Sequence, residues 1–183
     1  EATIPTNGGK VKVASDSAGP LAALVFKTTA DPFVGKLSYF RVYGGTFRAN
    51  SEVWNANKGQ SERVGQLFIP RGKSQEPVQE AVAGDIGAVA KLSVTATGDT
   101  LGQKDRPLVL AGLNFPNPVF TVAVHAKSKA DVDKMSTTLH RLAEEDPCLR
   151  ISREPATGEM LMSGMGDAHV EVVAEKGKRK FGV

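Results

Sequence analysis

Short apolar runs separated by Gly, Asn and Asp fill the chain as far as residue 117. Runs of this length, at this spacing, are typical of an all-β barrel or sandwich. No amphipathic helix is expected before residue 118. The expected strands are 22–29, 35–43, 46–50, 52–57, 62–70, 78–82, 86–93 and 108–111.

The first 19 residues lack this pattern. They contain Gly8-Gly9 and Gly19-Pro20 among scattered charged residues, a composition typical of a linker. We therefore predict a linker over residues 1–19 and a β-barrel domain over 20–117. Because the chain starts without Met and without a clear domain start, we expect it to be cut from a longer protein.

Pro116-Asn117-Pro118 marks the predicted domain boundary, because closely spaced prolines disfavour helix and stiffen the chain. Beyond it the pattern becomes strand, helix, strand, strand, helix, with a further strand expected from residue 180. This order predicts an α+β ferredoxin-like βαββαβ sandwich over 118–183, with its last strand truncated. The other expected elements are strands 119–125, 149–153 and 160–163 and helices 128–146 and 164–176.

The first of these helices has the clearest signals. Ser128 is expected to begin it, with Asp131 as the capping-box partner, and Asp146-Pro147 to end it. Gly177 costs roughly 1 kcal/mol relative to Ala within a helix, so the second helix is expected to stop near it. Apolar positions at steps of three, four and three give the first helix one buried stripe: Val132, Met135, Leu139 and Leu142.

Composition places few limits on this chain. A hydrophobic fraction of 40% and a charged fraction of 23% are ordinary for a soluble globular chain. No apolar run approaches the ~20 residues that span a bilayer, and residues 1–12 lack the apolar core of a signal peptide. One cysteine, Cys148, builds neither a disulfide framework nor a cysteine metal site within the chain. We expect a cytoplasmic protein with no membrane partner.

The net charge of +3 is unevenly distributed. Residues 1–117 hold 13 Lys and Arg against 10 Asp and Glu, whereas residues 118–183 hold 10 of each sign. The basic excess on the expected barrel permits contact with RNA without requiring it.

No catalytic constellation is apparent in the sequence. There is no G-x-x-x-x-G-K-[ST] loop to cradle a phosphate. His125, His140 and His169 are not at metal-ligand spacing with one another or with Cys148. Residues 163–166 differ from the G-x-S-x-G nucleophile elbow. We therefore expect no catalytic residue and no metal in this chain.

Five stretches, taken in their order and spacing, resemble the second and third domains of elongation factor G. The first is similar to the opening hairpin of the second domain, and the last to the strand-to-helix junction of the third. Residues 1–19 resemble the link from the nucleotide domain. The five stretches are Phe26–Gly45, Ala83–Val89, Thr97–Leu101, Leu142–Pro147 and Ser163–Glu171.

The resemblance implies a parent protein that binds the ribosome and uses GTP hydrolysis to move tRNA and mRNA during elongation. In that family the barrel contacts small-subunit ribosomal RNA. The third domain communicates among the nucleotide-binding domain, the C-terminal domain and a small-subunit ribosomal protein. This chain would then be a non-catalytic binding and coupling module without a cofactor, with GTP and Mg²⁺ held in the absent nucleotide domain.

Two sets of residues are candidates for contact with partners. Lys27, Lys36 and Arg41 flank the Asp31-Pro32-Phe33 turn and are candidates for binding RNA phosphates. The strand-to-helix junction is the candidate interface with the other domains or the ribosome, on the strength of the resemblance. The interface candidates are Ser163, Gly164, Met165, Gly166, Asp167 and His169.

Within the junction, Gly164 and Gly166 let the backbone turn sharply and are expected to leave the first helix amides exposed. Such amides would suit a carboxylate or phosphate of a partner. His169 has apolar helix neighbours four residues away on each side, Met165 and Val173. It is therefore either a residue packed at the edge of the core or an interface residue.

Three departures from the family pattern leave alternatives open. Asp167 and Ala168 stand where the family usually has Glu and Leu, and Gly177 stands where it usually has Leu. They are compatible with a divergent member, or with a paralogue such as a ribosomal protection protein or a peptide-release GTPase. An alternative from another class is a free-standing RNA-binding barrel with an appended sandwich.

Overall fold

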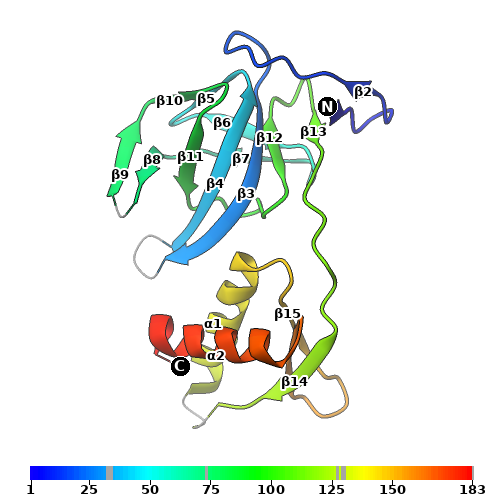
Figure 1. Cartoon of the computed structure of the whole chain (residues 1–183), viewed down its shortest axis with the longest axis vertical. Coiled ribbons are helices and arrows are strands. Elements are labelled where there is room, and N and C mark those ends of the chain that lie inside the picture. Colours follow the sequence, from blue (N-terminus) through cyan, green and yellow to red (C-terminus); the bar gives the residue numbers. More distant parts are fainter. Residues whose placement is uncertain (32–34, 73, 127, 129–130, 183) are drawn as a thin grey trace. The chain divides into compact units, whose positions relative to one another are not determined.

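The computed structural model describes residues 1–31, 35–72, 74–126, 128 and 131–182 (Figure 1). Two compact units divide between Leu113 and Asn114, a few residues before the Pro116-Asn117-Pro118 segment. The first unit is a β-barrel domain and the second is an α/β unit of ferredoxin-like type. Each unit is described by itself.

The first unit is built on an eight-stranded antiparallel sheet with the order β7-β6-β12-β3-β4-β11-β8-β9. A second pair of strands, β5 and β10, lies apart from it in the hydrogen-bonding pattern. The strands are β3 (Ala22–Asp31), β4 (Gly35–Gly44), β5 (Thr46–Arg48), β6 (Glu52–Asn55), β7 (Gln60–Arg63), β8 (Leu67–Arg71), β9 (Ser74–Val78), β10 (Glu80–Val82), β11 (Ile86–Ala90) and β12 (Thr100–Gly102).

Alternation along β4 shows how the barrel core is formed. Ser38, Phe40 and Val42 are fully buried, whereas the residues between them face outward. Successive side chains of a strand point to opposite faces, so one face of β4 supplies the core. The ring of Phe40 packs 4.6 Å from that of Phe47 on β5, centroid to centroid. The core also takes Leu21, Ala23, Val25, Val53, Val64, Leu67, Ala81, Val89, Leu92 and Leu101.

A buried carboxylate fastens a loop to this barrel. Glu62 on β7 is 5% exposed, and its carboxylate accepts the amide hydrogens of Ser93, Val94 and Thr95 at 2.6 to 2.9 Å. The hydroxyls of Ser93 and Thr95 donate to it as well. Burial raises the pKa of Glu62, but these hydrogen bonds outweigh burial and hold the pKa below its ordinary value. Folding therefore stabilises the ionised form of the Glu62 carboxyl group.

Several expectations for this unit were wrong in detail. The predicted strand 78–82 is divided between β9 and β10, and β12 was not among the expected strands. The predicted strand 62–70 is two strands, because residues 64–66 turn to meet the segment before β6: the Val64 amide donates to the Ser51 carbonyl, and Gly65 accepts from Asn50. Residues 1–19 showed no strand pattern, yet β1 (Ala2–Thr3), β2 (Lys10–Val11) and β13 (Val109–Leu110) form a sheet. A small cluster holds this segment in place, since Ala2 packs with Ala22, Leu24, Leu108 and Leu110.

The second unit has a three-stranded antiparallel sheet of order β14-β16-β15 and two helices. Met135, Leu139, Leu142, Leu149, Met162, Val170 and Val173 form a single core between the sheet and the helices. The elements are β14 (Phe120–Val124), α1 (Val132–Glu145), β15 (Arg150–Arg153), β16 (Met160–Gly164) and α2 (Asp167–Phe181).

The start of α1 differs from the expectation. Asp131, not Ser128, is the N-cap residue, and the hydroxyl of Ser128 donates to the Asp131 carboxylate at 2.7 Å. Val132 is 44% exposed because it lies in the first turn, before α1 reaches the core. Thr138 instead joins Met135, Leu139 and Leu142 on the buried face. Asp146 caps the other end of α1, which confirms the expected stop.

The end of α2 is also a correction. The helix passes through Gly177 to Phe181 and is capped by Gly182 at φ 68°, so the strand expected from residue 180 is helical up to Phe181. Buried Gly177 lies close to Leu142 and Thr138 of α1, and Phe181 packs against the core. Packing therefore overrides the local cost of glycine. Within the described part of the chain, no helix has the length and apolar character needed to cross a membrane.

Candidate functional site

Basic and aromatic side chains alternate on the outward face of β3 and β4. Lys27 lies opposite Tyr39 in the strand register, and its Nζ is 6.0 Å from the centre of the Tyr39 ring. Two and four residues further along β4 come Arg41 and Tyr43, with the guanidinium 5.5 Å from the Tyr43 ring centre. Since all four project from the same face, Lys27, Tyr39, Arg41 and Tyr43 form one basic–aromatic strip.

The strip has the chemistry of a nucleic-acid contact. Tyr43 is 41% exposed, and Ile86, which lies opposite Arg41 on β11, is 47% exposed. Among the described residues, no carboxylate forms an ion pair with Lys27 or Arg41. Cations of this kind bind phosphates, and exposed aromatic rings stack on bases.

Lys36 does not join Lys27 and Arg41. By strand alternation it belongs with Ser38 and Phe40, on the opposite face of β4 from Arg41, and it is half-buried. The turn that these residues were expected to flank includes Pro32 and Phe33, which lie outside the described residues. Tyr39 and Tyr43 were missed as candidates, although their alternation with Arg41 in the sequence was a usable signal.

The junction between β16 and α2 is held by its own polar groups. The hydroxyl of Ser163 lies 2.8 Å from that of Thr121 on β14. The Met165 amide donates to Nδ1 of His169 at 3.0 Å, and the Asp167 carboxylate accepts from the Ala168 amide at 2.7 Å. The expectation of free amides was therefore wrong for Met165 and Ala168, because side chains of the junction already accept their hydrogens.

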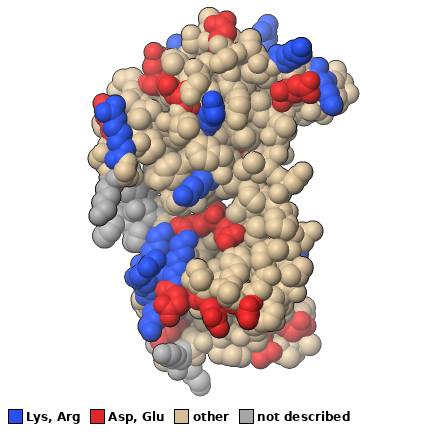
Figure 2. Space-filling view, viewed as in Figure 1, with Lys and Arg blue, Asp and Glu red and all other residues tan. Residues whose placement is uncertain are grey.

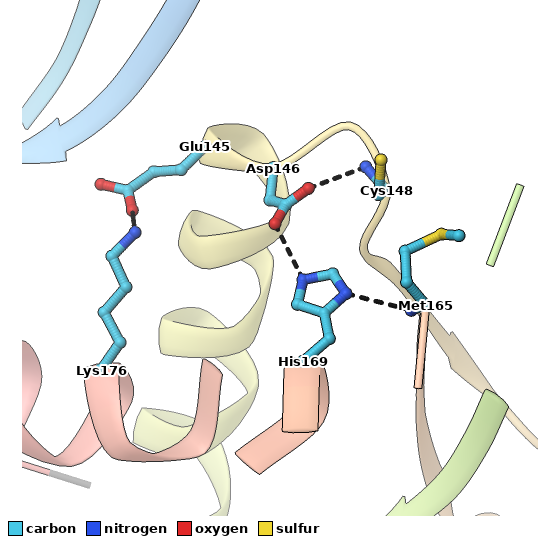
Figure 3. A network of polar contacts seen from close by, with 6 residues as sticks. All are labelled: Glu145, Asp146, Cys148, Met165, His169 and Lys176. Atoms are coloured by element: carbon cyan, nitrogen blue, oxygen red, sulfur yellow. Dashed lines mark hydrogen bonds and ion pairs between the residues drawn. The ribbon is translucent and has the colours of Figure 1, made fainter. Parts of the chain in front are cut away.

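His169 links the start of α2 to the end of α1 (Figure 3). Because Nδ1 accepts from the Met165 amide, the ring hydrogen is on Nε2, which donates to Asp146 Oδ2 at 2.9 Å. The other oxygen of Asp146 accepts from the Cys148 amide at 2.9 Å. His169 is thus a polar connector at the edge of the core, with its side chain 20% exposed, and Asp146 is the partner that the sequence did not reveal.

Gly164 makes room for the His169 ring. A Cβ at this position would lie 3.0 Å from His169 Nδ1 and 3.2 Å from Val170 Cγ2. Any larger residue would push the ring away from the Met165 amide. Gly166 has an extended backbone and open space around it, so its role as the N-cap residue is not steric.

A second link between the helices is ionic. Glu145, whose side chain is 4% exposed, forms ion pairs with Lys176 and Lys180 of α2. Figure 2 shows basic side chains gathered beside acidic ones on this unit. Lys178 and Arg179 in the same turn are exposed. In the described residues, no group of three His, Cys, Asp or Glu side chains is placed to hold a metal ion.

The architecture defines a class of protein: a β-barrel followed by a ferredoxin-like unit, a tandem found in translation factors. Residues 20–104 match the family described as elongation factor G domain 2, and residues 115–183 match elongation factor G, domain III. The chain is therefore an elongation factor G-like segment that carries these two domains.

A solved structure supports this assignment. A crystal structure of a protein from Thermus thermophilus is 34% identical in sequence, with a TM-score of 0.75. The match covers 90% of this chain and 25% of the Thermus chain. The chain thus spans about a quarter of the length of that relative.

Proposed function

We propose that this chain is the ribosome-binding and coupling part of a translational GTPase that promotes translocation of tRNA and mRNA during elongation. In this proposal the barrel binds small-subunit ribosomal RNA, and the ferredoxin-like unit contacts a small-subunit ribosomal protein. The observation that carries the proposal is the pair of elongation factor G domains in consecutive order.

The geometry supports a binding role for the barrel. The basic–aromatic strip offers Lys27 and Arg41 to phosphates and two tyrosine rings to bases or sugars. Binding through such cations weakens with salt, because neutralised phosphates release their counterions. The strip lies on strands whose inner face is the barrel core, so its spacing is rigid.

The geometry of the second unit supports a coupling role. The start of α2 is joined to the end of α1 by the hydrogen bond between His169 and Asp146. Further along α2, Lys176 and Lys180 form ion pairs with Glu145 of α1. Because the two helices are fixed to each other in this way, a displacement of the Ser163–His169 junction also moves the end of α1. In the intact protein, the nucleotide-binding and C-terminal domains would cause that displacement. GTP with Mg²⁺ would bind in the nucleotide-binding domain. The chain itself contributes no chemistry.

Sedimentation with ribosomes tests the proposal. The 183-residue chain is expected to co-sediment with small ribosomal subunits at low salt and to be released as salt rises. Addition of GTP is expected to leave this binding unchanged, with no phosphate released. If the chain stays in the supernatant at low salt while its thermal melting shows a folded protein, the ribosome-binding function is wrong.

A further inference from the structure

A pocket of about 320 Å³ lies on the outer surface of the barrel, around the single tryptophan of the chain. Trp54 is on β6, where Val53 and Asn55 on either side are buried and Trp54 faces outward. The pocket is separate in sequence and strand position from the basic–aromatic strip: its lining comes from β5, β6, β7 and the segment after β12. Leu21 and Val53 of its lining belong to the barrel core, and none of the other lining side chains has been given a role above.

The strand neighbours of Trp54 leave its ring accessible. In the register, Trp54 lies opposite Ser61 on β7 and opposite Gly102 on β12. One neighbour has a short polar side chain and the other has none, so neither covers the indole. The fold requires glycine at position 102, because a Cβ there would lie 2.9 Å from the Leu21 carbonyl oxygen. The barrel therefore presents a flat aromatic platform between two small residues.

A cation already occupies one face of this platform. The Nζ of Lys104 lies 5.4 Å above the centre of the Trp54 ring, an attractive cation–π arrangement. Lys104 is exposed and long, so it can swing aside at little cost. Around it, the side chains of Ser61 and Gln103 can donate and accept hydrogen bonds, and the Glu52 carboxylate can accept them.

We propose that this pocket binds an unstacked base of single-stranded or looped RNA. The base stacks on the indole in place of the Lys104 ammonium, which moves to the phosphate of the same nucleotide. The polar edge of the base meets Glu52, Gln103 and Ser61. A nucleotide combines an aromatic face, a polar edge and a negative charge, and the pocket offers a counterpart to each. The inference rests on the proposed ribosome-binding function and names a second RNA contact on the barrel.

Trp54 is also the reporter that tests the proposal. A labelled single-stranded RNA of about twelve nucleotides, a length that fits one small binding surface, is titrated into the whole chain. Binding is followed by the anisotropy of the label and by tryptophan emission. We expect saturable quenching of Trp54 with the same midpoint as the anisotropy change, and little quenching by a double-stranded RNA of the same sequence. Binding of the single strand without any change in Trp54 emission would overturn the proposal.

Three variants separate stacking from charge. Trp54→Leu keeps the apolar bulk but removes the aromatic face, and is expected to weaken RNA binding by about 5- to 150-fold, the range that loss of one stacked base gives. Trp54→Phe keeps a ring and should retain most of the affinity. Lys104→Met should reduce the log–log salt slope by about 0.7, the value for one phosphate contact on a single strand. Equal affinity of the wild type and a folded Trp54→Leu variant would also overturn the proposal.

Ribosome sedimentation distinguishes this inference from the function on which it rests. If wild type and Trp54→Leu sediment equally with small subunits, the pocket proposal fails and ribosome binding stands. If RNA quenches Trp54 but the wild type does not sediment, the pocket stands and the ribosomal function fails. Reduced sedimentation of Trp54→Leu, with Trp54→Phe close to the wild type, supports both.

Discussion

His169 donates its Nε2 hydrogen to Asp146 across 2.9 Å, joining the first turn of α2 to the C-cap of α1. The other ring nitrogen of His169 accepts a hydrogen bond from the Met165 amide, and the other carboxylate oxygen of Asp146 accepts one from the Cys148 amide. The His169–Asp146 pair thus connects four segments: the end of α1, the loop after it, the residue after β16 and the start of α2.

Removing either partner of this pair should destabilise the second unit. His169→Ala leaves the Met165 amide and the Asp146 carboxylate without their acceptor and donor, and about 1–3 kcal/mol of unfolding free energy is expected to be lost. Asp146→Ala should cost a similar amount, and the double variant less than the sum, because both remove the same contact. Urea unfolding of the four proteins gives the coupling energy. Strict additivity would mean that the contact contributes nothing.

His140 provides the matched control. It lies exposed on α1, the helix that Asp146 caps, so His140→Ala is expected to change stability by less than about 0.5 kcal/mol. In the intact protein, His169→Ala also lowers the amount of folded protein. If it slows translocation by more than that loss explains, His169 has an interface role as well as a structural one. Normal activity of the folded fraction would confine His169 to holding the junction.

Glu62 should make the barrel sensitive to acid. Its folded-state pKa lies below the ordinary value of ~4.3 for a glutamate, so the unfolded chain takes up a proton first as pH falls. The stabilisation is present above the unfolded pKa and is lost as pH falls through the folded pKa. We expect wild-type stability to decline below about pH 5, and a Glu62→Gln variant, already weakened at pH 7, to decline less steeply.

Thermal melting from pH 7 to pH 3 measures both effects. At pH 7, Glu62→Gln is expected to lose about 1.5–3 kcal/mol of unfolding free energy relative to the wild type, the range for hydrogen bonds to a charged group. Glu76→Gln is the control, because Glu76 is exposed and its pair with Arg71 lies at the surface, where ion pairs contribute little. Parallel pH profiles for wild type and Glu62→Gln would show that Glu62 does not titrate with folding.

The elements found from sequence are those with a strong period or punctuation. Short apolar runs between turn residues located β3, β4, β6 and β11, and the Asp146-Pro147 stop located the end of α1. What escaped depends on tertiary contacts. Residues 1–13 have no local pattern that distinguishes them from a linker, because the small cluster around Ala2 and Leu24 holds them in place. The last turn of α2 likewise has no local pattern that distinguishes it from a strand, because the packing of Phe181 against the core holds it.

The candidate sites divide in the same way. Lys27, Lys36 and Arg41 were grouped from the sequence because they flank the Asp31-Pro32-Phe33 turn. The parity that places Lys36 on the opposite face of β4 from Arg41 requires an established strand register. His169 was singled out as the informative residue of the junction. Its partner Asp146 lies 23 positions away, and Lys104, which follows the neighbouring strand β12, is far from Trp54 in the sequence although the two are in contact. Such pairs are set by the topology and have no signature along the chain.

Gly177 offers a stabilising substitution. It lies inside α2, and a Cβ at this position would be 3.5 Å from Leu142 Cδ1 and 3.6 Å from Thr138 Cγ2, which is ordinary van der Waals contact. Gly177→Ala is therefore expected to raise the stability of the second unit by about 1 kcal/mol, the difference in helix propensity. The control is Gly158→Ala in the β15–β16 turn, where φ is 74°. Alanine is strained there and should lower stability. A destabilised Gly177→Ala variant would show that α1 and α2 pack too closely for a methyl group.

The basic–aromatic strip should govern the affinity of the chain for ribosomes. Lys27→Glu with Arg41→Glu reverses two cations on one exposed face, so binding to small subunits is expected to fall at least tenfold. The log–log dependence on salt should become shallower by about 0.7 to 0.9 per lost phosphate contact. Both positions face solvent, so the melting temperature should stay close to the wild type.

Lys36 tests whether position on the strand, and not net charge, decides this effect. Lys36→Glu makes the same change of charge as either single variant, but Lys36 lies on the opposite face of β4 from Arg41. A small change for Lys36→Glu beside a large one for Arg41→Glu places the contact on the strip. Tyr39→Leu and Tyr43→Leu then ask whether the rings take part: loss of affinity at unchanged salt slope indicates stacking, because stacking neutralises no phosphate. If Lys36→Glu weakens binding as much as Arg41→Glu does, the attraction comes from the overall charge of the barrel, and the strip is not the binding surface.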